Sequence, residues 1–174
     1  MSENTLPLEI ERKFLIALPD AALLEDKSVK RLDIAQVYLR AGVSGAGRRI
    51  RRIRRIRSGA EERFFYTEKT RVTAVTRIER EHEITAAAFE ALLSERDEAL
   101  RTIKKTRYLV PFEGHTLEID VFPFWHDRAF CECELQSEDE PLPLPDWLHV
   151  YREVTADPRY TNRALARAVP DDTL

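Results

Sequence analysis

The sequence predicts one α+β domain whose strands form an antiparallel barrel or sandwich. Eight short segments have strand chemistry, and their spacing suits antiparallel pairing better than βαβ units. Three helices are expected: a short one after Pro19-Asp20, one over residues 85–98, and one near Asn162. The chain shows no internal repeat and no Gly/Ser-rich linker, so we expect residues 1–174 to form a single domain. The eight expected strands are residues 8–16, 35–40, 48–57, 63–69, 77–84, 102–110, 116–122 and 129–136.

The composition excludes several classes of protein. Hydrophobic residues make up 43% of the chain, which argues against global disorder. No stretch approaches the ~18 apolar residues of a transmembrane helix, and the N-terminus has no signal-peptide pattern. We therefore expect a cytoplasmic protein with no membrane partner.

The two cysteines do not predict a disulfide framework. Cys131 and Cys133 are two residues apart on an expected strand, so their side chains point the same way about 6.6 Å apart. A zinc site would need further ligands at metal-binding spacing, and the sequence around the cysteines does not show such a pattern. We expect both cysteines to be small buried apolar residues.

A net charge of −3 hides a strong segregation of charge. Residues 48–57 read RRIRRIRRIR, which is seven arginines in ten positions without an acidic residue. Without that block the remaining chain carries a charge of −10. The position of the acidic residues relative to the arginines therefore becomes the central question.

Strand parity sorts the charges into groups that share a strand face, and most groups are of one sign. Side chains at i and i+2 of a strand share a face. A wet sheet face would explain any single group, but like charges on adjacent strands repel one another. The alternative is a closed barrel with an ionic interior and with helices over its apolar outer faces. The groups are Glu9, Glu11 and Lys13; Glu79, Glu81 and Glu83; Lys105 and Arg107; Glu118 and Asp120; and Glu132 and Glu134.

An ionic interior indicates a bound ligand, because unpaired buried charge is unfavourable. Several arginines and lysines in one cavity indicate a polyanion. Clustered carboxylates indicate a hard divalent cation such as Mg²⁺ or Mn²⁺. A metal-bound polyphosphate satisfies both demands.

Ordered motifs then resemble those of a known family. The segment Glu9-Ile10-Glu11-Arg12-Lys13 is an ExExK signature, and it resembles the CYTH domain of the triphosphate tunnel metalloenzymes. The resemblance covers nearly the whole chain, and the ordered set is far more specific than ExExK alone. The further matching segments, in chain order, are Gln36-Val37-Tyr38-Leu39, the Arg-rich run, Thr67-Glu68-Lys69, Arg77-x-Glu79-x-Glu81, Lys105-Thr106-Arg107-Tyr108, Glu118-Ile119-Asp120, Glu132-x-Glu134, Glu153-Val154-Thr155, Arg159-Tyr160 and Asn162.

The resemblance implies a fold and an activity. The fold is an eight-stranded antiparallel β-barrel, a tunnel open at both ends, with flanking helices. The implied reaction is attack of a metal-activated water on a terminal phosphoryl group, with Mg²⁺ or Mn²⁺ as cofactor and a small-molecule triphosphate as substrate. Inorganic tripolyphosphate is favoured, because the sequence places no aromatic pair as a clamp for a base or a thiazole ring.

Other functions remain open at this point. Thiamine triphosphatase and class IV adenylyl cyclase activities occur on the same fold. A non-catalytic polyphosphate or nucleic-acid binder would use the Arg-rich run. We expect no nucleic-acid partner, since the carboxylate pairs would repel phosphate unless metal were present. A purely structural domain is disfavoured by the ordered motifs, and the sequence leaves a monomer and a homodimer both open.

The resemblance also implies roles for particular residues. The carboxylates of four strands supply metal ligands or orient the nucleophilic water, and the lysines and arginines hold phosphates. The implied catalytic residues are Lys13, Tyr38, Glu79 and Glu81; the substrate-binding residues are Arg52, Arg54, Lys69, Arg77, Lys105 and Arg107; and the metal ligands are Glu9, Glu11, Glu118, Asp120, Glu132 and Glu134.

The Arg-rich run departs from the family's single Arg-x-Arg pattern. Isoleucine recurs at every third position, and a period of three cannot keep all isoleucines on one strand face. Three pairs could point inward, namely Arg49/Arg51, Arg52/Arg54 and Arg55/Arg57. Spacing to the lysine strand of related members favours Arg52/Arg54, with the surplus arginines on a wet surface or at a secondary anion site.

Overall fold

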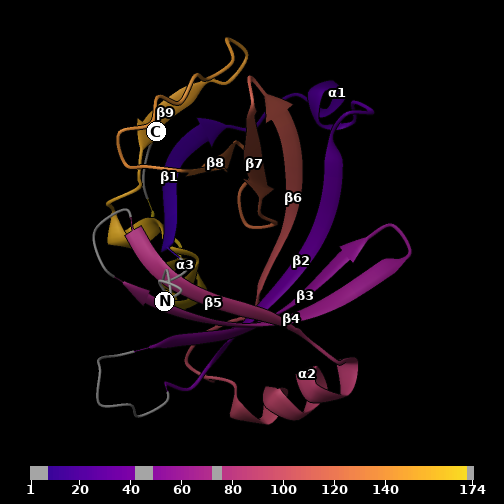
Figure 1. The fold of residues 1–174 in the computed structure, drawn as a ribbon. Helices are drawn as coiled ribbons and strands as arrows, with labels where there is room; N and C mark the ends of the chain where they lie inside the picture. Colours follow the sequence, from indigo (N-terminus) through magenta and orange to yellow (C-terminus); the bar gives the residue numbers. More distant parts are fainter. Residues whose placement is uncertain (1–7, 42–48, 72–75, 172–174) are drawn as a thin grey trace, which may run out of the picture.

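Nine strands and a few short helices make up the described part of the chain (Figure 1). The computed structural model describes residues 8–41, 49–71 and 76–171, and leaves out the side chains of residues 8, 9, 70, 71, 76 and 77. The strands are β1 (Leu8–Ala17), β2 (Lys30–Leu39), β3 (Ile50–Ser58), β4 (Glu61–Arg71), β5 (Thr76–Ile84), β6 (Ile103–Phe112), β7 (His115–Val121), β8 (Arg128–Leu135) and β9 (Val150–Glu153). The helices are α1 (Ala21–Leu24), α2 (Ala86–Leu92), η1 (Leu93–Glu95), η2 (Pro158–Tyr160) and α3 (Asn162–Arg167).

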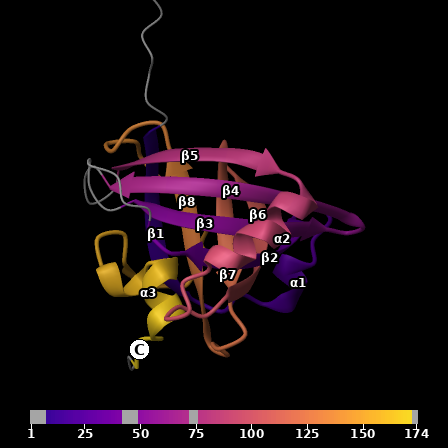
Figure 2. The same ribbon diagram turned by 90° about the horizontal axis from the view of Figure 1, so that it is seen from below.

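Eight of the strands surround a central space, with strand order β5-β4-β3-β2-β6-β7-β8-β1 (Figures 1 and 2). All pairings are antiparallel, and β1 also pairs with β5 through three residue pairs, Leu8–Ile78 to Ile10–Thr76. Further along β1, the short strand β9 takes the place of β5 beside Phe14–Ile16. The prediction of an eight-stranded antiparallel barrel is therefore confirmed, and its seam between β1 and β5 is short.

Two elements differ from the sequence-based expectation. The strand β9 was not expected from the sequence. All four of its residues are exposed, so no buried face imposes the apolar/polar alternation by which a strand is recognised. The helix expected over residues 85–98 ends earlier, with α2 followed by one turn of η1. Its N-terminus lies where expected, and Thr85 is the N-cap: its hydroxyl accepts a hydrogen bond from the Ala88 backbone N–H at 3.1 Å.

The outer faces of the barrel are covered in two different ways. Helix α2 packs Phe89 against Leu39 and Ile53 of β2 and β3, beneath the barrel in Figure 1. The outer face of β1, β7 and β8 is instead covered by irregular chain that includes Leu144, Trp147 and Leu148. The expectation that helices cover the apolar outer faces holds in part for this half, where Leu24 of α1 is buried together with side chains of a Pro-rich segment.

Cys131 and Cys133 lie in that second cluster. Their residues are 0% and 1% exposed, and both thiols are free. Burial raises the pKa of both thiols, which keeps them protonated. The expectation that they are buried apolar residues is confirmed.

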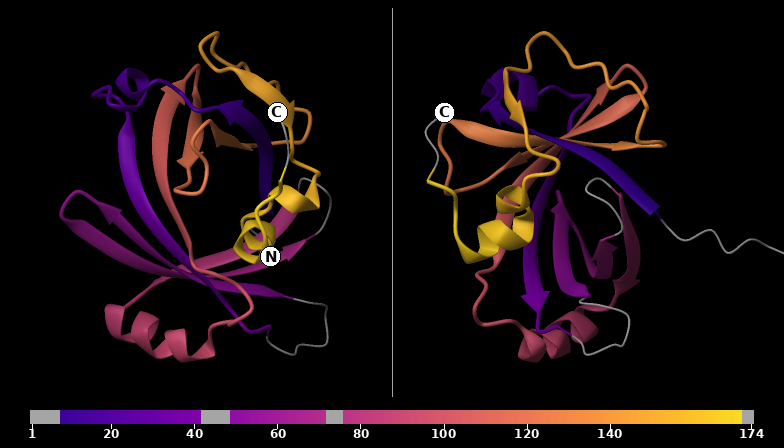
Figure 3. Two further views of the ribbon diagram at one scale, coloured as in Figure 1. Left: turned by 180° about the vertical axis from the view of Figure 1, so that it is seen from behind. Right: turned by 90° about the vertical axis from the view of Figure 1, so that its left-hand side faces the viewer.

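A third apolar cluster fills one end of the barrel interior. Leu15 and Phe130 share strand faces with charged residues further along β1 and β8, and Tyr38 lies on the inward face of β2, which brings neutral side chains to the cavity. Tyr160 of η2 and Leu165 of α3 pack against these inward side chains. The C-terminal chain, in yellow, runs from β9 to α3 on the side of the barrel that β1 forms (Figures 1 and 3). This end of the tunnel is therefore packed, which corrects the expectation of two open ends.

Among the described residues, no helix combines the length and the apolar character needed to cross a membrane.

Candidate active site

One cavity of about 820 Å³ occupies the barrel interior. Charges of both signs line it, because inward positions of seven strands carry Lys, Arg or Glu. Tyr38 also lines this cavity. The predicted cations on its wall are Lys13, Arg52, Arg54, Lys69, Lys105 and Arg107, and the predicted carboxylates are Glu11, Glu79, Glu81, Glu118, Glu132 and Glu134.

Three predicted residues are not placed on the cavity wall. Asp120 is 0% exposed and lies behind Lys105 and Arg107, with which it forms ion pairs. The side chains of Glu9 and Arg77 lie outside the described part of the structure. The backbone register sets these two residues opposite each other where β1 meets β5.

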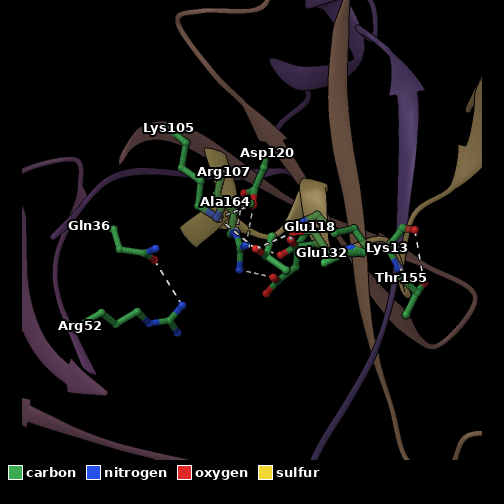
Figure 4. Close-up of polar contacts among 12 residues, drawn as sticks. Lys13, Gln36, Arg52, Lys105, Arg107, Glu118, Asp120, Glu132, Thr155 and Ala164 are labelled. Atoms are coloured by element: carbon green, nitrogen blue, oxygen red, sulfur yellow. Dashed lines mark hydrogen bonds and ion pairs between the residues drawn. The ribbon is translucent and has the colours of Figure 1, made fainter. Parts of the chain in front are cut away.

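Arg107 donates hydrogen bonds to three carboxylates of β7 and β8 (Figure 4). Its Nε and Nη2 atoms donate to the two oxygens of Asp120, each at 2.7 Å, and Nη2 also donates to Glu132 Oε2 at 2.7 Å. Glu118 accepts a further hydrogen bond from Nη1. Burial acts to lower the pKa of Arg107, but these carboxylates raise it well above its ordinary value. Arg107 therefore remains charged and organises this wall.

Lys13 is held by its side chain and by its backbone. Its Nζ lies 2.6 Å from Glu132 Oε1 and 4.0 Å from the centroid of the Phe130 ring. Its backbone N–H donates to Thr155 Oγ1 at 2.9 Å (Figure 4). Its carbonyl accepts from the Val154 N–H at 2.8 Å. The C-terminal segment therefore positions the lysine of the ExExK signature.

Burial dominates the pKa shift of Lys105, whereas neighbouring cations dominate the pKa shift of Glu132. Burial and the neighbouring Arg107 lower the pKa of Lys105 to about 8, despite its ion pair with Asp120. Burial acts to raise the pKa of Glu132, but Lys13, Lys105 and Arg107 bring it well below its ordinary value. The cations thus keep Glu132 ionised inside the barrel.

A second wall is built by β3, β4 and β5. Arg52 Nη2 donates to Glu79 Oε1 at 3.2 Å, and Lys69 forms an ion pair with the same carboxylate. Arg54 Nη2 lies 2.5 Å from Glu81 Oε2. Burial and the charge of Arg52 lower the pKa of Arg54. The Nε atoms of Arg52 and Arg54 are buried and lack hydrogen-bond partners, so this wall has donor capacity for an anion.

The register of β3 explains the isoleucines at every third position. Ile50 and Ile56 line the cavity together with Arg52 and Arg54, whereas Ile53 points outward against α2. Of the three candidate pairs, the structure places Arg52/Arg54 on the cavity. The outward arginines have carboxylate partners: Arg49 with Glu68, Arg51 with Glu95, and Arg55 and Arg57 with Glu62.

The carboxylate oxygens on the cavity wall are suitable ligands for a hard divalent cation. Glu11 and Glu134 are cross-strand partners that both line the cavity, and carboxylate oxygens suit Mg²⁺ or Mn²⁺. Burial raises the pKa of Glu118, so a nearby cation would stabilise its ionised form. Within the described residues no three Asp, Glu, His or Cys side chains are grouped at metal-binding geometry. Asp120 lies behind the cavity wall and Glu132 is held by lysine and arginine. Glu11 and Glu134 meet across neighbouring strands on the wall itself, which makes them the first candidate pair for a cation.

Three further site residues had no role assigned from sequence. Gln36 is 1% exposed and contacts Arg52, Thr67 is 0% exposed and donates to Glu81 Oε2 at 2.6 Å, and Thr155 holds Lys13. Gln36 and Thr67 each lie two residues before a predicted site residue on the same strand face. That parity is the sequence signal that could have identified them.

The fold and the site together define a charged β-tunnel that can hold a phosphate chain together with cations. The CYTH domain family model matches residues 7–153. The chain therefore belongs to the CYTH domain family, as its ordered motifs indicated.

Named relatives support this assignment. An inorganic triphosphatase of Nitrosomonas europaea is 34% identical over 167 residues, which cover 93% of this chain and 99% of the relative. An inorganic triphosphatase of Acetivibrio thermocellus is 36% identical over 104 residues, or 59% of this chain. That match spans 65% of the Acetivibrio protein, slightly less than two thirds of its length.

Solved structures agree with the fold. The structure of the inorganic triphosphatase NE1496 matches with a TM-score of 0.56 and 32% identity, over 93% of this chain and 96% of that one. A protein from Pyrococcus furiosus matches with a TM-score of 0.53 and 23% identity, over 75% of this chain and 80% of that one. The second likeness concerns the fold alone.

Proposed function

We propose that this chain is a divalent-metal-dependent triphosphatase that hydrolyses inorganic tripolyphosphate. One observation carries the proposal: eight lysine and arginine residues, six glutamates and one aspartate line the same cavity. Such an interior is costly unless a ligand compensates it, and a metal-bound phosphate chain matches both signs of charge. The names of the two relatives support the same activity.

The proposed roles divide the cavity between two walls. Arg52, Arg54 and Lys69 hold phosphate oxygens on one wall, and Lys105 and Arg107 hold them on the other. Arg77 is proposed to join the first group, and Lys13 and Tyr38 to contact the reacting phosphoryl group. Glu79 and Glu81 hold the arginine clamp through ion pairs and are the candidates to orient the attacking water. Catalysis then depends on positioning and charge neutralisation, as phosphoryl transfer generally does.

Mg²⁺ or Mn²⁺ would be held by Glu11 and Glu134, with Glu9, Glu118, Asp120 and Glu132 as further proposed ligands. When bound, the cation supplies neutralisation of the phosphate charge and Lewis-acid polarisation of a phosphoryl oxygen. The reaction consumes one water, breaks one P–O–P bond and yields pyrophosphate and orthophosphate. We also propose that the 174 residues act as one cytoplasmic domain.

The cavity lining favours an inorganic substrate over thiamine triphosphate or a nucleotide. Tyr38 and Tyr160 are the two aromatic residues among the described cavity-lining residues. Tyr38 accepts a hydrogen bond from Gln36, and Tyr160 accepts one from Arg152 at 2.5 Å. Both rings belong to the packed apolar end of the barrel, so they do not form a free clamp for an organic ring.

Phosphate release from tripolyphosphate, ATP and thiamine triphosphate tests the proposal. Each substrate is offered with Mg²⁺, with Mn²⁺ and with a chelator. We expect metal-dependent release that is fastest with tripolyphosphate. Absence of metal-dependent release from all three would refute the hydrolase assignment, and faster release from thiamine triphosphate or ATP would change the substrate.

A further inference from the structure

Gln36 is a buried amide on the wall of the charged cavity. It lies on β2, is 1% exposed, and its side chain lies between the side chains of Arg52 and Tyr38. Both of its polar atoms are used: Arg52 Nη1 donates to Gln36 Oε1 at 3.3 Å, and Gln36 Nε2 donates to Tyr38 Oη at 2.6 Å. Figure 4 shows the amide facing the Arg52 guanidinium. Gln36 therefore links a proposed phosphate clamp to a proposed catalytic residue.

The two hydrogen bonds that join Arg52, Gln36 and Tyr38 form a relay, and its direction follows from the chemistry of arginine. A guanidinium has donors and no acceptor, so the amide oxygen of Gln36 must face Arg52. The amide NH₂ group then faces Tyr38, whose hydroxyl oxygen must accept. Since Gln36 already supplies the proton in that contact, the proton of Tyr38 is directed to a different acceptor. Tyr38 lines the cavity, where the phosphate oxygens of the substrate would be such acceptors.

The protonation state of Tyr38 is compatible with this role. Burial raises its pKa to about 12, although the charge of Arg52 opposes the shift. The hydroxyl consequently keeps its proton throughout the neutral and mildly alkaline range, and it can act as a hydrogen-bond donor there.

We propose that Gln36 is a positioning residue that turns Tyr38 into a hydrogen-bond donor toward the substrate and braces the guanidinium of Arg52 beside it. The inference rests on the proposed triphosphatase activity. It adds a residue that contacts no reacting atom and acts through two residues that do.

The variant Gln36→Glu tests the direction of the relay with nearly unchanged shape. A carboxylate at this position still accepts from Arg52, but it also accepts the proton of Tyr38 and withdraws it from the substrate. We expect kcat for tripolyphosphate to fall about tenfold, the effect of one lost hydrogen bond of roughly 1.4 kcal/mol. The change in KM should be smaller, because Arg52 keeps its partner.

A double-mutant cycle with Tyr38→Phe separates this role from the added charge. If Gln36 acts through Tyr38, the change Gln36→Glu should lower kcat in the wild type and change it less than about twofold in the Tyr38→Phe background. An equal loss in both backgrounds would overturn the proposal. Gln136→Glu is the matched control, because Gln136 is exposed and does not line the cavity.

Two further measurements keep the test decisive. Gln36→Met removes both hydrogen bonds without adding charge, so it replaces Gln36→Glu in the cycle if that variant unfolds. Tyrosinate absorbance, taken as the difference between each protein and its Tyr38→Phe counterpart, reports Tyr38 without substrate. We expect Gln36→Glu to raise the pKa of Tyr38, and an unchanged value would refute the relay. Wild-type turnover of tripolyphosphate tests the proposed function separately.

Discussion

Glu11 and Glu134 are directly opposite each other on the antiparallel strands β1 and β8, and both side chains line the tunnel cavity. Like charges at directly opposite positions destabilise a sheet. The arrangement is nevertheless compatible with a stable barrel that binds a divalent cation between its carboxylates. This pair therefore provides a direct test of the proposed metal site.

Replacing Glu134 by glutamine should separate stability from metal response. We expect Glu134→Gln to raise the free energy of unfolding of the metal-free protein by about 0.2–1 kcal/mol, since a repulsive pair is removed. The same change should reduce the stabilisation that Mg²⁺ or Mn²⁺ adds. Thermal unfolding with chelator and with each metal measures both effects. Glu98→Gln, at an exposed position, is the control. An unaltered metal response in Glu134→Gln would remove this pair from the metal site.

The two faces of β3 offer a matched comparison of arginines. We expect Arg52→Ala together with Arg54→Ala to raise KM for tripolyphosphate at least tenfold, because each lost charge-assisted hydrogen bond contributes about 1.5–3 kcal/mol. Arg55→Ala together with Arg57→Ala should leave KM within about twofold, since exposed ion pairs contribute little. Steady-state kinetics of the two double variants measure both KM values. If the outward pair has the larger effect, the phosphate clamp lies elsewhere.

Lys105 should give the stability of the metal-free protein a distinct dependence on pH. Its pKa is lowered from 10.5 to about 8 by burial, so between these values the unfolded chain binds a proton that the folded chain has released. The free energy of unfolding should therefore rise with pH in this window, by at most about 1.4 kcal/mol per pH unit for one proton. Urea denaturation between pH 7 and 10 would measure this slope, with pH values chosen on either side of about 8.

The variant Lys105→Met should flatten that slope, whereas Lys104→Met should not. Lys104 is its exposed neighbour on the same strand and provides the control. A slope that persists in Lys105→Met would assign the proton to another group.

The packed end of the tunnel depends on α3. Leu165 is 0% exposed and packs in the cluster that contains Phe130 and Tyr160. We expect Leu165→Ala to lower the free energy of unfolding by about 2–5 kcal/mol, because it leaves a cavity in a packed cluster. Leu18→Ala makes the same chemical change at a side chain that is 37% exposed, and should cost less than about 1 kcal/mol. Chemical denaturation of both variants checks the difference. Equal losses would mean that α3 does not close this end.

Much of the site could be predicted because strand parity is local. Glu118 and Glu132 share faces with Asp120 and Glu134 in any extended strand, whatever the rest of the chain does. The ordered motifs then indicated the family, the barrel and the cavity. Gln36 and Thr155 had no role assigned, because their contacts join segments that are distant in sequence.

By itself the sequence determined which residues share a face, that the charges of each sign occur in groups, and that the chain resembles the CYTH domain. The tertiary structure alone decided that Arg52 and Arg54 point inward, that Asp120 lies behind two cations, and that η2 and α3 pack one end of the tunnel. The physical reason is the separation in sequence of the residues that determine each feature. Face alternation follows from the backbone of one strand, whereas register, ion pairing and closure depend on contacts between strands that only the folded chain brings together.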